Sequence, residues 1–490
     1  MSHMTASEAA VRTVKFYTDG KWEDAPGRES HAIVNPATGQ TIARLPYANA
    51  ADVDRAARAA HAAFLKWREV PVVERVQVFY RYKDLLEKHA AEIARILSSE
   101  NGKTLEDAAG SVRRAIQMVE VVCGMPSLMM GQSLENVSKG IDCQTIRQPL
   151  GVCAGITPFN FPAMVPMWMF PFAIACGNSF ILKPSEKVPL TPTRTAELLD
   201  DAGLPAGVYN LLHGAREAVD ALLAHPLVRA ISFVGSSPVA KYVYQTAAAH
   251  GKRVQALGGA KNHLVVMPDA NIGKSVEAIM GSAFGAAGER CLAGSVLVLV
   301  GESRPVLDAL LEKVRNLRVG DGTTQGTEMG PLVTADHRTR VLGYIEKGVQ
   351  EGARLLIDGR ARIAGHQDGC FLGPTVFDKV TPEMTIAREE IFGPVLSVIR
   401  VKDLDEAIAL VNSSAFGNTT SIFTSHGGAA REYAARVEVG MVGVNVGVAA
   451  PMAFFPFSGW KNSFFGDLHA HGRDAVAFYT EQKVIMSRWF

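Results

Sequence analysis

The chain has 490 residues, of which 48% are hydrophobic and 20% are charged, and its 50 Lys and Arg residues almost balance 49 Asp and Glu residues to give a net charge of +1. A chain of this length can bury a large core and divide into two or three domains, and its balanced charge offers no basic excess for nucleic acid or for an anionic membrane surface. The 6 cysteines are scattered without CxxC pairs, which is typical of a reducing compartment, and we therefore expect a cytoplasmic protein.

The N-terminal part of the chain is predicted to be helical. Its first segment, MSHMTASEAAVRTVKF, lacks the apolar core of a secretory signal. In residues 51–67, ADVDRAARAAHAAFLKW, apolar side chains recur at spacings of three and four, which indicates an amphipathic helix. Similar patterns occupy residues 73–97 and 108–122, and the polar alternation over residues 132–148 favours a hairpin.

An uncharged stretch runs from Gln148 to Leu182 and exceeds the about 20 residues that a membrane-spanning helix needs. Proline interrupts it repeatedly, and each proline removes a backbone donor that a helix in lipid would require. The prolines are Pro149, Pro158, Pro162, Pro166 and Pro171. We therefore interpret the stretch as the buried core of an α/β domain and expect no membrane association.

From residue 150 onward, short apolar segments alternate with helical patterns. VCAGITP, SFILKPS, GVYNLL and AISFVGS are predicted strands with helices between them, and a second series continues through NHLVVM, SVLVLV, a helix near residues 304–316, VLSVIRV, SIFTS and GMVGVNV. Such alternation predicts parallel sheets with right-handed crossovers, which commonly bind nucleotides. The C-terminal segment, DAVAFYTEQKVIMSRWF, is a candidate to add a strand to a partner subunit.

Two strand ends offer candidate cofactor contacts, although the dinucleotide fingerprint GxGxxG is absent from the sequence. ILKPSE places Lys183 and Glu186 just past a strand, where both side chains could hydrogen-bond ribose hydroxyls. FVGSSPVAK places Gly235 and Ser236 at a strand-to-helix turn, whose free N–H groups suit a pyrophosphate. Taken alone, each motif is equally compatible with a solvated loop.

A cysteine and an asparagine are candidates for the chemistry. AFGAAGERCLAG, residues 283–294, surrounds Cys291 with small residues that leave room for another molecule, so this thiol is a candidate nucleophile. TPFNFP places Asn160 inside the uncharged stretch, where a buried amide either braces a turn or donates to an oxyanion.

Two further motifs contain acidic or histidine side chains that could belong to a binding site. In EEIFGPV, Glu389 and Glu390 either line a site or carry charge at a helix end. His469 and His471 in HAHG resemble a metal-binding pair, but no further ligand residues cluster near them in the sequence, and we expect no metal.

Over nearly its whole length the chain resembles the aldehyde dehydrogenase superfamily. The resemblance rests on six motifs in a fixed order and at these separations: TPFNFP, ILKPSE, GLPAGVYNLLHG, FVGSSPVA, GERC and EEIFGP. The resemblance implies an α/β aldehyde dehydrogenase fold with a Rossmann-like NAD-binding domain of residues 1–129 and 149–255 and an α/β catalytic domain of residues 256–450. A small β oligomerisation element and the C-terminal tail, residues 130–148 and 451–490, complete it. A homodimer or homotetramer is also implied.

The resemblance further implies roles for individual residues. Cys291 matches the nucleophile that attacks an aldehyde carbonyl and then carries a thioester, and Asn160 with the Cys291 N–H matches the oxyanion site. A carboxylate at the Glu186 position repels a 2′-phosphate, which favours NAD over NADP. Contacts to NAD are implied for Thr157, Phe159, Lys183, Glu186, Gly235, Ser236, Glu390 and Phe392.

One departure from the superfamily pattern narrows the function. A hydrolytic member usually carries a Glu base in a motif close to ELGGK, whereas this chain has QALGGAKNH. Counting back from Lys261 places Leu257 at the base position, and a one-residue gap places Ala256 there. Neither side chain can accept a proton, so attack by water on the thioester should be slow and we expect another nucleophile to take the acyl group.

In this respect the chain resembles one branch of the superfamily, the CoA-acylating methylmalonate-semialdehyde (malonate-semialdehyde) dehydrogenases. The resemblance rests on the missing base and on the motifs GAKNH, GERC, MVPMWMFP and PMAFFPFSGWKNSFFGDLHAHG. The branch converts methylmalonate semialdehyde to propionyl-CoA, and malonate semialdehyde to acetyl-CoA, with formation of NADH and CO₂. Arg114 and Arg290 match its substrate-binding arginines, and a guanidinium suits a carboxylate. The choice of Arg114 over the neighbouring Arg113 rests on the resemblance.

Two other interpretations remain open from the sequence. One is a hydrolytic NAD(P)-dependent aldehyde dehydrogenase that releases a free acid. The other is a non-catalytic structural or binding protein on the same fold, against which the presence of both Cys291 and Asn160 argues. The sequence does not favour malonate over methylmalonate semialdehyde, nor valine over inositol or β-alanine breakdown.

Overall fold

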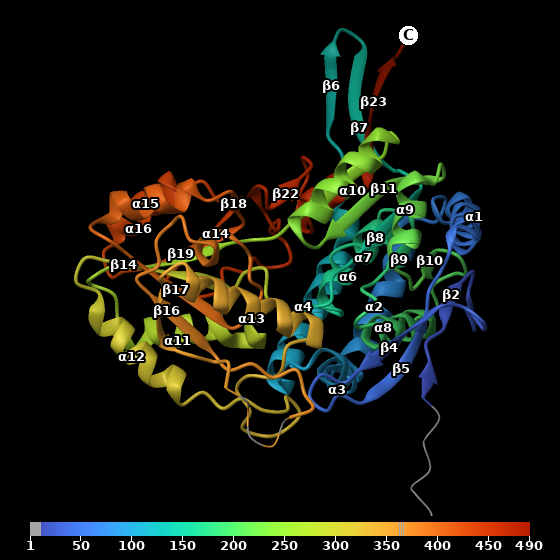
Figure 1. The fold of residues 1–490 in the computed structure, drawn as a ribbon. Coiled ribbons are helices and arrows are strands. Elements are labelled where there is room, and N and C mark those ends of the chain that lie inside the picture. The colour runs from blue at the N-terminus through green and yellow to red at the C-terminus, as the bar shows by residue number, and fades with distance from the viewer. Residues whose placement is uncertain (1–10, 362, 364, 366) are drawn as a thin grey trace, which may run out of the picture.

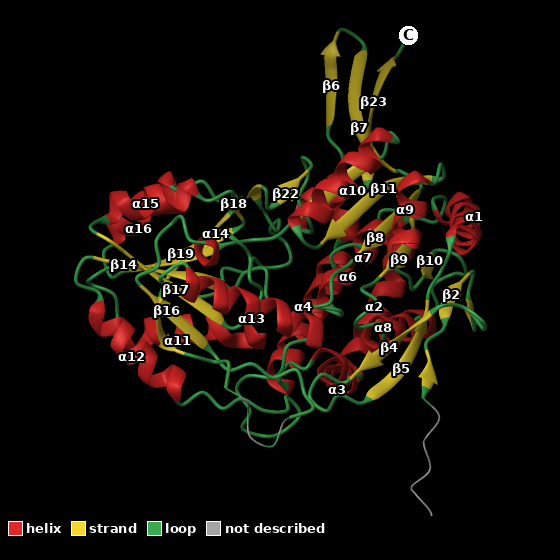
Figure 2. Ribbon diagram, viewed as in Figure 1, coloured by secondary structure: helices red, strands yellow, loops and turns green. Residues whose placement is uncertain are grey.

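The computed structural model describes residues 11–361, 363, 365 and 367–490, which form two large β-sheets surrounded by helices (Figures 1 and 2). One sheet has 8 strands and the other has 7. Both consist largely of parallel strands, so the predicted α/β architecture is confirmed. Residues 1–10, with which the expected NAD-binding domain begins, lie outside the described residues.

The first large sheet has the strand order β22-β12-β11-β8-β9-β10-β2-β3, and its central strands from β12 to β10 run parallel. The four strands predicted between residues 152 and 236 are confirmed, and β12 runs through the expected domain boundary at residues 255 and 256. The strands are β2 (Phe16–Thr18), β3 (Lys21–Glu23), β8 (Val152–Ile156), β9 (Ser179–Lys183), β10 (Tyr209–Leu211), β11 (Val228–Val234), β12 (Arg253–Leu257) and β22 (Phe464–Phe465).

Helices pack around this sheet, and α1 shows why the predicted ones form. The Asn49 side chain accepts hydrogen bonds from the N–H groups of Ala51 and Asp52, and the Asp52 carboxylate accepts one from the Asn49 N–H, so these N–H groups at the start of the helix are satisfied. The helices are α1 (Ala50–Trp67), α2 (Val72–Lys88), α3 (Ala90–Asn101), α4 (Leu105–Cys123), α5 (Met125–Leu128), α6 (Met164–Met167), α7 (Phe170–Ala175), α8 (Leu190–Asp201), α9 (Arg216–Ala224), α10 (Ser237–Ala249) and α17 (Gly472–Phe478). A small sheet of β1 (Arg12–Thr13), β4 (Ser30–Val34) and β5 (Thr41–Pro46) lies beside them.

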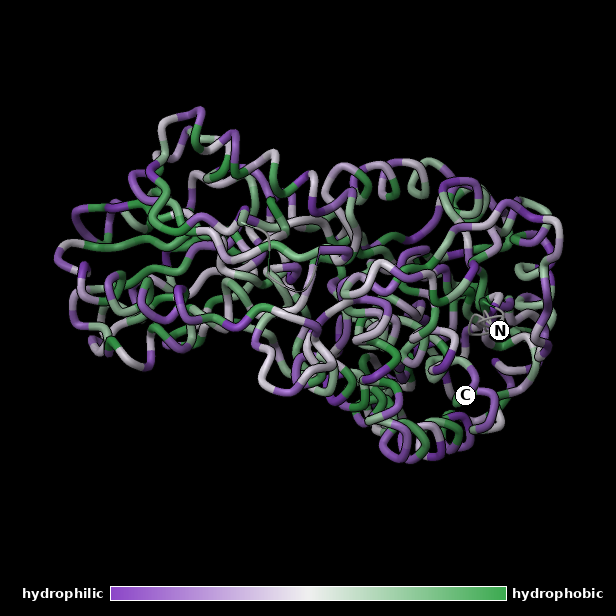
Figure 3. Tube along the Cα trace, turned by 60° about the horizontal axis from the view of Figure 1, so that its bottom comes forward, coloured by the Kyte–Doolittle hydropathy of each residue, from purple (hydrophilic) through white to green (hydrophobic). Residues whose placement is uncertain are grey.

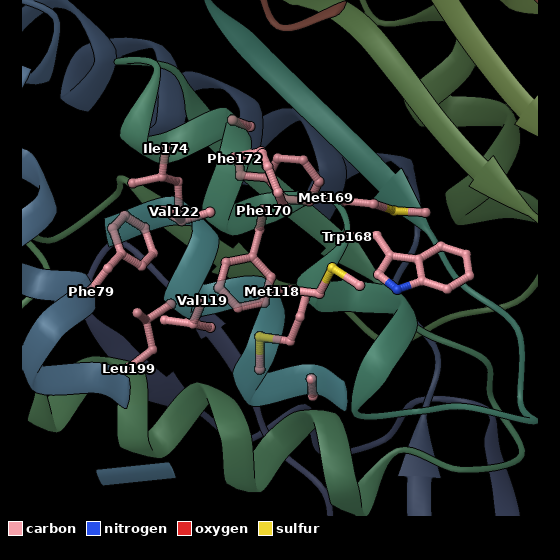
Figure 4. Close-up of a cluster of buried hydrophobic side chains, with 14 of the residues drawn as sticks. Phe79, Met118, Val119, Val122, Trp168, Met169, Phe170, Phe172, Ile174 and Leu199 are labelled. Carbon is pink, nitrogen blue, oxygen red and sulfur yellow. The ribbon is translucent and has the colours of Figure 1, made fainter. Parts of the chain in front are cut away.

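The uncharged stretch of the sequence forms the core of this part of the molecule. Figure 4 shows Trp168, Met169 and Phe170 in one buried cluster with Phe79 and Met118, which belong to α2 and α4. Fully burying one such side chain stabilises the fold by roughly 1.5–3 kcal/mol. Its interpretation as core is confirmed, and among the described residues no helix combines the length and the apolar character that crossing a bilayer requires.

The second large sheet has the order β15-β16-β17-β14-β13-β19-β20, and only its edge strand β15 is antiparallel to its neighbour. Its interior strands are hydrophobic and run between more hydrophilic outer segments (Figure 3). The strands are β13 (Asn262–Val266), β14 (Gly294–Val300), β15 (Arg354–Ile357), β16 (Thr375–Asp378), β17 (Val395–Val401), β19 (Thr419–Phe423) and β20 (Met441–Val444). The helices are α11 (Ile272–Phe284), η1 (Gly285–Gly288), α12 (Arg304–Arg315), α13 (Ala335–Gln350), α14 (Thr385–Arg388), α15 (Leu404–Ser413) and α16 (Gly427–Arg436).

A third, antiparallel sheet of β6 (Ser133–Ser138), β7 (Ile141–Pro149) and β23 (Thr480–Arg488) projects from the molecule (Figure 1). The predicted hairpin is confirmed. β23 pairs along its whole length with β7 of its own chain and forms an edge of this sheet, so the addition of this strand to a partner subunit stays a prediction. The β23 side chains Val484 and Met486 are 61% and 68% exposed, and the oligomerisation role of this sheet stays a prediction.

Candidate active site

Cys291 lies in the loop between η1 and β14, and an unusual turn leads into it. Ala286, Ala287 and Gly288 have φ values of 49°, 52° and 71°, in the left-handed region that residues with a Cβ rarely adopt. Such backbone strain persists only where the surroundings hold it. Here the Ala286 N–H donates to the Asp107 carboxylate at 3.0 Å, which ties the turn to the first turn of α4.

Two asparagine amides fix the backbone of the nucleophile. The Cys291 carbonyl accepts hydrogen bonds from Asn262 Nδ2 at 2.9 Å and from Asn418 Nδ2 at 2.8 Å, and Asn262 also donates to the Ala293 carbonyl at 2.8 Å. Sequence reasoning missed both residues. The signal for Asn262 was its place at the head of an apolar strand, where a buried amide requires partners.

The surroundings of Cys291 disfavour its thiolate form. Burial raises its pKa to about 12, and the negative charge of Glu390 adds to the increase. Glu390 accepts a hydrogen bond from the Ala260 N–H at 2.9 Å, and burial raises its own pKa to about 7. The structure therefore couples Cys291 to Glu390, which the resemblance assigned to the nicotinamide ribose.

Replacing Glu390 by Gln is expected to speed alkylation of Cys291 by iodoacetamide, because removing the negative charge lowers the thiol pKa. At pH 8 to 9 we expect an increase of up to about tenfold, which corresponds to one pKa unit. The difference should shrink as the pH falls below about 7, where Glu390 becomes neutral in the wild type as well. Mass spectrometry of the Cys291 peptide measures the rate.

Glu389→Gln is the matched control, since the Glu389 carboxylate instead accepts a hydrogen bond from the Tyr344 hydroxyl at 2.8 Å. Equal alkylation rates in the wild type and the Glu390 variant across this pH range would contradict the electrostatic coupling.

The Asn160 side chain reaches the segment that precedes the nucleophile, and its role toward an oxyanion stays a prediction. Its side-chain amide donates to the carbonyl of Glu289 at 3.0 Å, and its own carbonyl accepts from Lys103 Nζ at 2.5 Å. Lys103 is buried and lies 4.1 Å from the centroid of the Phe161 ring, and burial lowers its pKa to about 8. An amide has two N–H donors, so one remains for a developing oxyanion.

The predicted cofactor contacts surround the C-terminal edge of the first sheet. Lys183 Nζ pairs with Glu186 at 3.2 Å at the end of β9. The Thr157 hydroxyl, just past β8, is buried and has no hydrogen-bond partner among the described residues. Gly235 and Ser236 precede α10, where Ser236 makes no side-chain cap. The Gly235 N–H donates to the Leu257 carbonyl at 3.0 Å and is therefore not free, so the Thr157 hydroxyl and the uncapped start of α10 are the features that fit a dinucleotide with a pyrophosphate.

The two predicted aromatic contacts pack together. The rings of Phe159 and Phe392 meet edge to face at 5.7 Å, and Lys187 Nζ lies 4.8 Å from the Phe159 centroid. Phe392 has φ of 58°, and its carbonyl lies 2.7 Å from His337 Nε2. Lys187 and His337 are further neighbours of this site that sequence reasoning missed.

The base position holds an apolar side chain. Leu257 is 3% exposed and belongs to the hydrophobic cluster against which Cys291 packs. Ala256, the alternative position, is fully buried in a separate cluster. Neither position offers a general base to water.

The two predicted substrate arginines have different surroundings. Arg290 pairs with Asp107 and donates to the Gly281 carbonyl at 3.1 Å. Arg114 Nη1 lies 3.4 Å from Gln117 Oε1 and 3.3 Å from the sulfur of Met452, and no ion pair with a carboxylate is formed by Arg114 within the described part of the chain. Arg114 is thus the guanidinium with charge available for an anionic ligand.

Known proteins share this architecture. The model of the Aldehyde dehydrogenase family matches residues 22–485. The malonate-semialdehyde dehydrogenase of Pseudomonas aeruginosa is 54% identical over 97% of this chain and 96% of its own length, and malonate-semialdehyde dehydrogenase 2 of Geobacillus kaustophilus is 52% identical over 98% and 99%.

Solved structures agree with these relatives. The crystal structure of methylmalonate-semialdehyde dehydrogenase from Oceanimonas doudoroffii has a TM-score of 0.96 and 48% identity, covering 98% of both chains. A putative methylmalonate-semialdehyde dehydrogenase from Sinorhizobium meliloti, complexed with NAD, has a TM-score of 0.96 and 46% identity over 98% of this chain and 99% of its own. This chain belongs to the aldehyde dehydrogenase family.

Proposed function

We propose that this enzyme is an NAD-dependent, CoA-acylating semialdehyde dehydrogenase that converts malonate semialdehyde to acetyl-CoA, and methylmalonate semialdehyde to propionyl-CoA, with release of CO₂ and NADH. Relatives that are about half identical over nearly their whole length carry the corresponding names. The observation that carries the proposal is the buried Leu257 at the position of the hydrolytic base.

The residues around Cys291 account for thioester formation. The Cys291 thiol gives its proton to solvent, the sulfur adds to the aldehyde carbon, and the free N–H of the Asn160 amide stabilises the oxyanion that forms. Lys183, Glu186 and the turn before α10 would hold NAD, which would serve as the hydride acceptor. Loss of hydride from the reacting carbon leaves an acyl group bound to sulfur as a thioester.

Release of the acyl group to a thiol requires no base at residue 257. A thiol with a pKa near ~8.5 is partly ionised at neutral pH and attacks a thioester directly, whereas water needs a general base. The β-carboxylate of the substrate lies next to the thioester carbonyl, which accepts the electron pair of the breaking C–C bond as CO₂ leaves. The enolate then takes a proton, so the acyl group transferred is acetyl or propionyl.

A hydrolytic dehydrogenase is the second candidate, because Glu390 is a carboxylate whose charge reaches Cys291. The reaction products distinguish the hydrolytic activity from the CoA-acylating activity. With NAD, malonate semialdehyde and CoA, we expect mass spectrometry to detect acetyl-CoA and CO₂ in equal amounts. Malonate as the main product in the presence of CoA would overturn the proposal.

Replacing Arg114 by Ala is expected to raise the KM for malonate semialdehyde by about 10- to 100-fold, because a charge-assisted hydrogen bond to the substrate carboxylate is worth roughly 1.5–3 kcal/mol. The KM for propanal, which lacks the carboxylate, should change less than about threefold. Steady-state kinetics with both aldehydes measure the difference.

Arg113→Ala is the matched control, since the Arg113 guanidinium pairs with Glu87 at 3.4 Å and with Glu120 at 3.2 Å. Equal changes for both aldehydes in the Arg114 variant would show that Arg114 does not contact the carboxylate.

The remaining expected partners form part of the same proposal. CoA acts as co-substrate, and the projecting sheet of β6, β7 and β23 presents exposed apolar side chains, including Val484 and Met486, that suit burial in a homodimer or homotetramer. The three-part domain division described from the sequence is proposed on the same basis, with the boundary between the large sheets after Leu257.

A further inference from the structure

The end of α3 contacts the loop that carries Asn160. Asn101 is the last residue of α3, and Gly102, with φ of 92°, turns the chain so that Lys103 follows at once. A Cβ at Gly102 would lie 2.7 Å from a carbon of the Pro331 ring, so this turn requires glycine. The Asn101 and Lys103 side chains, 2% and 3% exposed, are therefore held inside the protein by a turn that tolerates little change.

Both side chains donate to backbone carbonyls of this loop. Asn101 Nδ2 donates to the Phe159 carbonyl at 3.1 Å, and Lys103 Nζ donates to the Asn160 carbonyl at 2.5 Å. The peptide unit is planar, so the first contact fixes the plane on one side of the Asn160 Cα and the second fixes the plane on the other side. Two fixed planes set φ and ψ of Asn160, and with them the direction in which its side chain leaves the backbone.

From this fixed backbone the Asn160 side chain extends to the segment that precedes Cys291. Its amide donates to the Glu289 carbonyl at 3.0 Å, which leaves one N–H. Donors that are already oriented stabilise a developing charge without reorganisation during the reaction. The contacts made by Asn101 and Lys103 therefore bear on the oxyanion through the backbone of Asn160.

The Lys103 ammonium is costly to bury, which argues against a purely structural role. It lies 4.1 Å from the centroid of the Phe161 ring, and within the described ranges it forms no ion pair with a carboxylate. Asp107, whose negative charge acts on it, pairs with Arg290 instead. A methionine of similar length would pack there without the free-energy cost of burying a charge. What the ammonium adds is a strong donor to the Asn160 carbonyl.

We propose that Asn101 and Lys103 are positioning residues that hold Asn160 in the orientation in which its amide donates to the oxyanion. This inference rests on the proposed function and deepens it, because the oxyanion forms when Cys291 adds to the aldehyde. The two residues act on the reaction through Asn160 and not by contact with the reacting atoms.

The test is the rate of the first turnover after rapid mixing with NAD and malonate semialdehyde in the absence of CoA, measured by NADH absorbance. Removing an oxyanion donor costs about 10²- to 10³-fold in rate, so misdirecting one in Lys103→Met should slow the first turnover by about 10- to 100-fold. The Kd for NAD, measured by quenching of tryptophan fluorescence, should change less than about twofold, because the oxyanion forms only during the reaction.

Lys252→Met is the matched control. Lys252 is 8% exposed, and its ammonium likewise donates to two backbone carbonyls, those of His225 at 2.5 Å and Val228 at 2.8 Å. It precedes β12, at the opposite edge of the sheet from the cofactor contacts. Its loss should lower the melting temperature, as loss of a buried donor does, and leave the rate of the first turnover unchanged.

Two further variants make the test specific. Asn101→Leu keeps the size of the side chain, removes the donor to the Phe159 carbonyl and should slow the first turnover as Lys103→Met does, so the inference stays testable if Lys103→Met does not fold. In an Asn160→Ala background, Lys103→Met should cause no further loss of rate, because the amide through which it acts is already missing.

Three results would overturn the inference. An unchanged first turnover in Lys103→Met and Asn101→Leu would remove the role, and an equal slowing in Lys252→Met would mean a general effect of lost stability. A full further loss in the Asn160→Ala background would mean that Lys103 acts independently of Asn160.

The same experiment distinguishes this inference from the proposed function. Steady NADH formation by the wild type without CoA would defeat the proposed function alone, because the first turnover still reports addition to the aldehyde. A wild-type burst that stalls without CoA, at a rate that is the same in Lys103→Met and Asn101→Leu, would defeat this inference alone.

Discussion

Cys291→Ser is expected to lower kcat for malonate semialdehyde by at least about 10³-fold, because a neutral hydroxyl is a far weaker nucleophile than a thiolate and cannot form the thioester. Binding of NAD should persist, since none of the predicted cofactor contacts changes. NADH absorbance measures the first property, and the quenching of tryptophan fluorescence by NAD measures the second.

Cys143→Ser is the matched control, because Cys143 lies in β7 of the projecting sheet and is also a free thiol. It should keep full activity. Retention of more than about a tenth of the wild-type kcat in Cys291→Ser would contradict the role of Cys291 as nucleophile.

Leu257→Glu is expected to create hydrolysis that the wild type lacks. A carboxylate at this position belongs to the cluster against which Cys291 packs and can take a proton from water, and general-base catalysis contributes about 10²- to 10⁴-fold. We therefore expect the CoA-independent release of free acid to increase about 10²-fold. The same variant should lose roughly 1–3 kcal/mol of folding stability, because Leu257 is buried.

The variant Leu257→Gln distinguishes the effect of a general base at residue 257 from the effect of a polar side chain there. It has nearly the same size and polarity as the Glu variant but accepts no proton at neutral pH, so its CoA-independent rate should stay at the wild-type level. Liquid chromatography of the acid products gives both rates. Equal hydrolysis in the two variants would show that the missing carboxylate is not what suppresses attack by water.

Much of the fold follows from local patterns in the sequence. α1 has a periodic apolar face and a capping box, and β8 and β9 are short apolar runs bounded by turn residues, so each carries its own signal. β2 and β3 have 3 residues each, which is too short for a periodic pattern, and they form because the sheet edge offers them partners. β23 was predicted as a strand, but an amphipathic pattern does not say which chain supplies the neighbouring strand.

In the candidate site, too, local motifs could be predicted from the sequence and contacts between distant residues could not. Motifs that lie within a few residues, such as Lys183 with Glu186 or the turn at Gly235, could be assigned from sequence. The contacts that hold Cys291 join distant positions: Asn418 is 127 residues from it, and Asp107 is 183 residues from its partner Arg290. No local sequence pattern predicts contacts between such distant residues. A single acidic residue in a helical segment, such as Asp107, is usually exposed to solvent.

The central claim is that the acyl-enzyme on Cys291 waits for a thiol, because residue 257 offers no base to water. The most direct test is rapid mixing of the enzyme with NAD and malonate semialdehyde in the absence of CoA, followed by addition of CoA. We expect a burst of NADH of about one equivalent per Cys291, then a stall, then steady turnover once CoA is added. Steady NADH formation without CoA, at the rate seen with CoA, would contradict it.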